Sequence, residues 1–118
     1  MAKASQYLVW AIVAHLVADW LLQNDWMARN KASLAHPAAW VHGAIHFVAM
    51  LRIFPVHVAA SIAVLHMLID TRLPLRLWQQ AFRQTTDGPY AIPVAIWVDQ
   101  VLHIVILALA ALSVAAFA

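Results

Sequence analysis

Four pairs of residues that can bind metal ions recur in this chain at a spacing of four positions. The 118 residues include 7 His and 5 acidic residues, all of them Asp. Random placement would give roughly one His/Asp pair at this spacing. A spacing of four puts both side chains on one face of a helix, one turn apart. The pairs therefore indicate a functional arrangement: His15 with Asp19, His42 with His46, His66 with Asp70, and Asp99 with His103.

The paired residues have the ligand chemistry of a dinuclear metal site. Bundles of helices build such sites from nitrogen and oxygen ligands on facing helices. Five imidazoles and three carboxylates suit two divalent metal ions with about four protein ligands each. Zn²⁺ fits this ligand set best and Fe or Mn also fit, whereas the absence of Cys excludes a thiolate site.

Two other interpretations of the pairs remain open. A single His–Asp pair can be a hydrogen bond along one helix that serves packing alone. A haem held by two His is known from helical bundles, but haem leaves the three Asp without a role. The metal site is favoured because it uses all four pairs together.

The composition predicts an integral membrane protein of one domain, residues 1–118. The chain is 65% hydrophobic with a mean hydropathy of +0.79, and only 10% of its residues are charged. A soluble domain would carry about 25% charged residues. The net charge of +2 comes from few charges and does not indicate nucleic-acid binding.

The apolar runs predict an all-α fold, a four-helix transmembrane bundle. The expected helices cover about 4–24, 37–54, 55–71 and 91–117, with a polar connection at 27–36. Pro37 and Pro55 mark the starts of the second and third helices. Between helices 3 and 4, apolar residues alternate with Arg and Gln over about 73–84, which predicts a short interfacial amphipathic helix.

The basic residues predict the orientation in a bacterial inner membrane. Lys3 and Arg52 belong to one side of the multi-pass bundle, and five Lys and Arg residues belong to the other side. The more basic side should be cytoplasmic, which leaves both termini outside. At about 1.5 Å per residue, the four His/Asp pairs can all lie in one layer near the cytoplasmic face.

Four further residues are candidates for supporting roles around the metals. Gln23 continues the stripe of His15 and Asp19, and Gln100 adjoins Asp99, so either could orient a ligand or be an interfacial polar residue. Lys31 and His36 lie in the connection above the layer, where they could meet an anionic substrate or simply face solvent. No catalytic residue is assigned from the sequence.

The motif residues also carry a resemblance. The pattern His15-x-x-x-Asp19-Trp20-x-x-Gln23, with the three later pairs, resembles a family of small bacterial and phage integral membrane proteins of unknown function. The resemblance covers nearly the whole chain and implies a helical membrane protein, with no established activity. A looser similarity, to membrane-bound metal-dependent hydrolases, assigns no residue.

The favoured functional hypothesis is a metal-dependent hydrolase of a membrane-associated ester or phosphoester. The alternatives are a conduit for metal ions or protons, and a structural metal that stabilises a small membrane interaction protein. Transport is less favoured because the outer halves of the helices offer few polar residues. The expected partners are the lipid bilayer and a lipid-like or phosphoester substrate, without nucleic acid, and the bundle could form a homo-oligomer.

Overall fold

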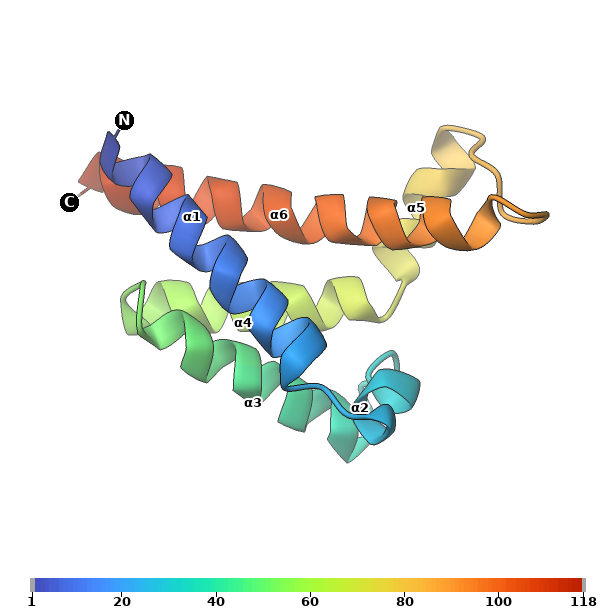
Figure 1. Ribbon diagram of the computed structural model, residues 1–118, viewed down its shortest axis with the longest axis horizontal. Helices are drawn as coiled ribbons and strands as arrows, with labels where there is room; N and C mark the ends of the chain where they lie inside the picture. The colour runs from blue at the N-terminus through green and yellow to red at the C-terminus, as the bar shows by residue number, and fades with distance from the viewer. Residues whose placement is uncertain (1, 118) are drawn as a thin grey trace.

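Helices form wherever the sequence has a long apolar run, and Pro or polar residues bound those runs. The computed structural model describes residues 2–117, and no strand occurs among them. The order of elements is α1 Ala2–Leu16, the π-helical turn η1 Val17–Leu21, α2 Asp25–Asn30, α3 Pro37–Leu51, α4 Val56–Asp70, α5 Leu73–Ala81 and α6 Ala91–Phe117 (Figure 1). The expectation of an all-helical fold is confirmed.

Several boundaries differ from the predicted ones, and α2 was not predicted. The first helix changes from α to π geometry after Leu16, a change that the apolar pattern does not reveal. α2 lies partly in the predicted polar connection. It begins because the Asn24 side chain accepts a hydrogen bond from the backbone N–H of Met27 at 3.0 Å. The prediction missed α2 because this cap is local and no apolar run accompanies it. The second and interfacial helices end three residues early, at Leu51 and Ala81.

The four long helices close into a ring. α1 packs against α3 and α6, and α4 packs against the same two helices. The start of α1, the end of α6 and the connection 52–55 lie at one end of the molecule, which we call the terminal end (Figure 1). α2, α5 and the connection 82–90 lie at the opposite end, the loop end (Figure 1).

Two helical segments are long and apolar enough to cross a membrane, Lys3–Leu21 and Ala91–Phe117. α4 and α5 together would be a third candidate, but the chain bends by 63° between them. α3 and α4 each have 15 residues, about 22 Å of helix, which is shorter than the roughly 30 Å hydrocarbon core. The predicted four transmembrane helices are therefore confirmed only in part.

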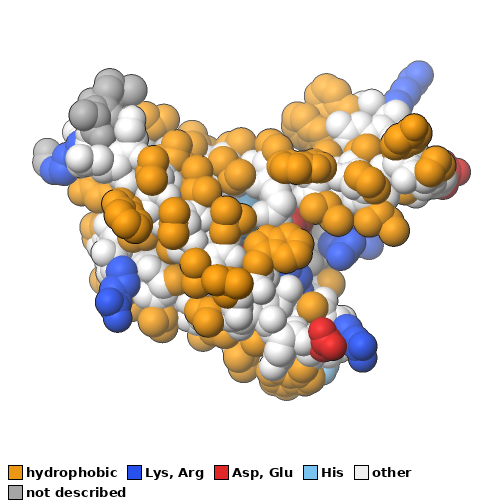
Figure 2. Space-filling view, in the orientation of Figure 1, with side chains coloured by type: hydrophobic (Ala, Val, Ile, Leu, Met, Phe, Trp, Pro, Cys, Tyr) orange, Lys and Arg blue, Asp and Glu red, His pale blue; other side chains and the backbone are white. Residues whose placement is uncertain are grey.

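The surface has the distribution of charge expected of a membrane protein. Hydrophobic side chains are spread over the whole visible face, and Lys and Arg side chains lie toward its two ends (Figure 2). Large residues such as Trp10, Trp40 and Leu109 are more than half exposed on the long helices. Such a surface is favourable in lipid and unfavourable in water.

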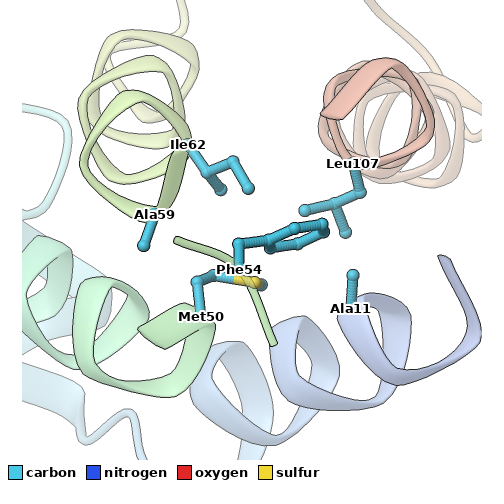
Figure 3. Close-up of a cluster of buried hydrophobic side chains, with 6 residues drawn as sticks. All are labelled: Ala11, Met50, Phe54, Ala59, Ile62 and Leu107. Carbon is cyan, nitrogen blue, oxygen red and sulfur yellow. The ribbon is translucent and has the colours of Figure 1, made fainter. Parts of the chain in front are cut away.

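An apolar cluster fills the interior toward the terminal end. Figure 3 shows its side chains pointing toward one another from α1, α3, α4, α6 and the connection 52–55. The Tyr7 ring stacks on Phe54 with centroids 5.8 Å apart, which ties the connection to α1. The cluster is the main contact between the helices there, and it consists of Ala11, Met50, Phe54, Ala59, Ile62 and Leu107.

Gly43 lets α3 approach α4 beside the His residues. A Cβ at this position would lie 2.5 Å from Sδ and 2.8 Å from Cγ of Met67. Gly43→Ala is therefore expected to displace the Met67 side chain from the contact between α3 and α4 and to lower stability by about 1–3 kcal/mol. The measurement is thermal unfolding in detergent.

A neighbouring surface substitution is the control for Gly43→Ala. Val41 is 42% exposed on the same helix, so Val41→Ala should change stability by no more than about 0.5 kcal/mol. Equal melting temperatures for Gly43→Ala and the wild type would contradict the close packing of α3 on α4.

Candidate metal centre

The structure brings the four pairs together in the interior of the ring. Seven of the eight side chains are buried, with at most 4% of each residue exposed, while the Asp99 side chain is 21% exposed. They come from all four long helices and from η1. We call them the His/Asp cluster: His15, Asp19, His42, His46, His66, Asp70, Asp99 and His103.

Asp19 projects from the π turn toward α3. Its Oδ1 lies 3.0 Å from Nε2 of His42 and 3.4 Å from Nε2 of His46. The Lys31 Nζ lies 3.7 Å from the same oxygen. Single π turns in α-helices are frequent at functional sites, where the wider turn redirects a side chain. Here the turn holds a buried carboxylate between two imidazoles and one ammonium group.

Asp70, at the end of α4, is the second carboxylate at the centre. Its Oδ2 lies 2.8 Å from Nε2 of His66 and 3.4 Å from Nε2 of His42. Its Oδ1 lies 3.3 Å from Nε2 of His103 on α6. His42 therefore stands between the two carboxylates and joins the two halves of the cluster.

The imidazole rings are in mutual contact. The rings of His46 and His66 stack with centroids 3.6 Å apart, and those of His66 and His103 are 4.6 Å apart. The His15 ring lies 5.0 Å from His103 and 5.3 Å from His46. Protonating several such rings at once would place like charges side by side in a buried region, which is unfavourable.

The geometry of these donor atoms fits metal binding. One ligand atom from each of Asp19, His42, His46 and His66 lies within 4.8 Å of the others, and so does one from each of His66, Asp70 and His103. Nε2 of His46, His66 and His103 and Oδ2 of Asp70 are buried and make no hydrogen bond within the described chain. The short distances from Asp70 to His66 and His103, and from Asp19 to His46, are thus poorly aligned as hydrogen bonds. Donor atoms that lie this close together with unused lone pairs can bind a metal ion.

His103 is oriented by its own helix. Its Nδ1 lies 2.8 Å from the backbone oxygen of Asp99, and because that oxygen can only accept, Nδ1 carries the proton. The lone pair of Nε2 then faces Asp70 and the cluster. The Asp99 carboxylate lies 3.6 Å from the same Nδ1. Such an outer partner, which sets the tautomer, is typical of His ligands.

Two of the eight predicted ligands lie outside the two groups of donor atoms. His15 Nε2 lies 3.2 Å from Gln100 Oε1 and 3.8 Å from Asp19 Oδ2. The Asp99 carboxylate lies at the edge of the cluster, where Gln100 Nε2 donates to it at 3.3 Å. The structure therefore places His15 beside the central donors and leaves Asp99 with an accessible carboxylate.

The four predicted supporting residues take different positions. Gln100 contacts His15, Asp19 and Asp99, and Lys31 contacts Asp19. The Gln23 side chain lines the cleft described next. His36 instead caps α3: its Nδ1 accepts a hydrogen bond from the N–H of Ala38 at 3.0 Å.

A cleft of about 520 Å³ leads from the His/Asp cluster to the surface at the loop end. The carboxylates of Asp19, Asp70 and Asp99 contribute to its wall, and so do the cations Lys31 and Arg72. Arg72 has a left-handed backbone with φ of 67° at the start of α5. Arg72 directly precedes the predicted interfacial helix of 73–84 and was not predicted to reach the site, although its position two residues after Asp70 was a signal of proximity to it.

The fold and the cluster define an all-helical protein with two candidate membrane spans and a buried His/Asp group that could hold a metal ion. The chain belongs to DUF3307, a family of proteins of unknown function, whose pattern matches residues 7–118. The predicted membership of a family of unknown function is thereby confirmed. Neither a curated protein nor a solved structure matches the chain.

Proposed function

We propose that this protein is a metal-dependent hydrolase of a membrane-associated phosphoester or ester. The observation that carries the proposal is the cleft, because it gives the buried donors a route to the surface. A metal with only a structural role needs no such opening. The cations Lys31 and Arg72 in the cleft wall favour an anionic substrate, such as a phosphoester, over a neutral ester.

Two divalent metals, with Zn²⁺ most suitable and Fe or Mn as alternatives, would divide the donors between them. His66 belongs to both groups of donor atoms, but one imidazole nitrogen binds one metal. One ion would therefore use Asp19, His42 and His46, supported by His15, and the other would use His66, Asp70 and His103. Three ligands for each ion leave positions for water and substrate, as in catalytic zinc sites.

A bound divalent metal would supply an activated water and stabilise negative charge in the transition state. The chain itself would contribute three further functions. Lys31 and Arg72 would bind the anionic group of the substrate, and the buried walls of the cluster would limit access of bulk water. Asp99, exposed to the cleft and outside the two groups of donors, would accept the proton from the attacking water.

The structure favours this proposal over a conduit for ions. The apolar cluster around Phe54 and Leu107 occupies the interior between the His/Asp cluster and the terminal end. An ion crossing this region would lose its hydration without gaining ligands, which is costly at membrane depth.

The membrane setting is part of the same proposal. The five basic residues of α2, α5 and their flanking connections lie at the loop end, whereas Lys3 and Arg52 lie at the terminal end. The distribution supports an inner-membrane protein with the cleft toward the cytoplasm and both termini outside. The lipid bilayer would then present the substrate at the mouth of the cleft.

The test is hydrolysis of two chromogenic probes by protein reloaded with Zn²⁺, Mn²⁺ or Fe²⁺ in detergent: a p-nitrophenyl phosphodiester and a p-nitrophenyl ester. The wild type should cleave the phosphodiester faster. Asp99→Asn should lower the rate by about 100-fold or more at unchanged metal content, because it removes the proton acceptor.

Asp25→Asn is the matched control, since Asp25 is exposed on α2 and does not line the cleft. It should retain the wild-type rate. If metal-loaded wild type cleaves neither probe, or if Asp99→Asn is as active as Asp25→Asn, the proposed hydrolytic mechanism is wrong.

A further inference from the structure

A second groove, of about 710 Å³, lies between α1 and the last turn of α3. It is separate from the cleft, because the lining residues of the two have none in common. On α1 and the first residue of η1 the lining follows one helical face with the spacing i, i+4, i+7, and includes Lys3, Tyr7, Trp10, Ala14 and Val17. Ala49, Arg52 and Ile53 line it on the side of α3.

The groove has the length and surface of a site for an acyl chain. From Lys3 to Val17 the helix rises by about 21 Å, which exceeds the roughly 15 Å that one leaflet contributes to the hydrocarbon core. Trp10 is 63% exposed and Val13 is 44% exposed along it. The Tyr7 ring is held against Phe54 of the apolar cluster, so this wall of the groove is supported from within.

Cations alone provide the charge along the groove. Lys3 and Arg52 both line it, and no acidic residue does. All five Asp belong to η1, α2, the end of α4, the connection before α6 and the first half of α6. Neither Lys3 nor Arg52 therefore has an ion-pair partner among the described residues.

A second copy of this chain does not suit the groove. Two copies in one membrane share the same orientation, and a twofold interface would bring the same face of each copy together. Lys3 and Arg52 of both copies would then lie at the same depth, with four cations close together and no acidic residue to balance them. An anionic occupant with an apolar tail satisfies both parts of the groove.

We propose that the groove between α1 and α3 binds one anionic phospholipid. An acyl chain would lie along Trp10, Ala14 and Val17, and the phosphate would lie at the terminal end, where Lys3 and Arg52 line the groove. This site lies at the terminal end, away from the cleft, and its occupation does not depend on bound metal or on hydrolysis.

The experiment is lipid retention measured by native mass spectrometry, after the protein is mixed with equal amounts of phosphatidylglycerol and phosphatidylcholine with identical acyl chains. Wild type should retain one phosphatidylglycerol in preference, on the order of tenfold. The double variant Lys3→Gln, Arg52→Gln should lose the preference. Arg29→Gln, Arg76→Gln, which removes two charges at the loop end, should keep it.

Equal retention of the two lipids by wild type would overturn the proposal, and so would an unchanged preference in the Lys3/Arg52 variant. A dimer that excludes lipid and is held through Trp10, detected by cross-linking from that position, would assign the groove to a second copy instead. Thermal unfolding measured on the same samples shows that each variant is folded and keeps this result independent of the metal and hydrolase tests.

Discussion

His66→Ala should reduce the metal content of the purified protein from about two ions per chain to one or fewer. His66 contributes to both groups of donor atoms, and its Nε2 lies 2.8 Å from Asp70 Oδ2. Without it, Asp70 and His103 remain as two ligands, too few for a stable site. The measurement is elemental analysis of protein purified without chelator and without added metal.

His57→Ala is the matched control because His57 lies on the same helix but is exposed near its start. It should leave the metal content unchanged. His66→Ala should also melt at a lower temperature than His57→Ala, since it leaves a cavity next to the buried carboxylate of Asp70. Equal metal content in His66→Ala and wild type would show that the cluster does not bind metal through His66.

Chelation of the metal in wild-type protein should lower the melting temperature. A ligand at 100 times its Kd stabilises the folded state by about 2.7 kcal/mol, so two tightly bound ions contribute more than that. The gain is expected because the buried carboxylates of Asp19 and Asp70 otherwise depend on imidazoles, Lys31 and the Gln100 amide. Thermal unfolding in detergent, with and without chelator, measures it.

The same treatment should have a smaller effect on His66→Ala, which has less metal to lose. Hydrogen exchange should increase after chelation in η1 and at the end of α4, where Asp19 and Asp70 lie, and should change little around the apolar cluster. Suppose that metal is removed and the melting temperature does not move. The bundle would then be stable without its metals, and the cluster would be maintained for chemistry alone.

Much of the fold could be predicted because it depends on local pattern. The apolar runs and the residues Pro37 and Pro55 place the long helices, and the predicted α6 agrees with Ala91–Phe117. The π turn and α2 could not be found in this way. A π turn depends on how Asp19 is held by α3, and α2 depends on a single cap by Asn24.

The prediction of membrane-spanning helices has the same limit, because it also depends on local pattern. Hydropathy identified four apolar segments, but the length of each helix is decided where its backbone hydrogen bonds end. α3 ends at Leu51 and α4 at Asp70, and the chain then bends by 63° into α5. Within residues 2–117, only α1 with η1, and α6, retain the length that a crossing requires by itself.

By itself, the sequence determined which residues form the His/Asp cluster, because a spacing of four is a property of one helix and needs no knowledge of its neighbours. The tertiary structure alone decided how these residues lie relative to one another. The packing of α1, α3, α4 and α6 placed His42 between the carboxylates of Asp19 and Asp70, and left Asp99 at the edge. The bend before α5 opened the cleft and brought Arg72 to it, because contacts between distant segments depend on helix packing and not on spacing along the chain.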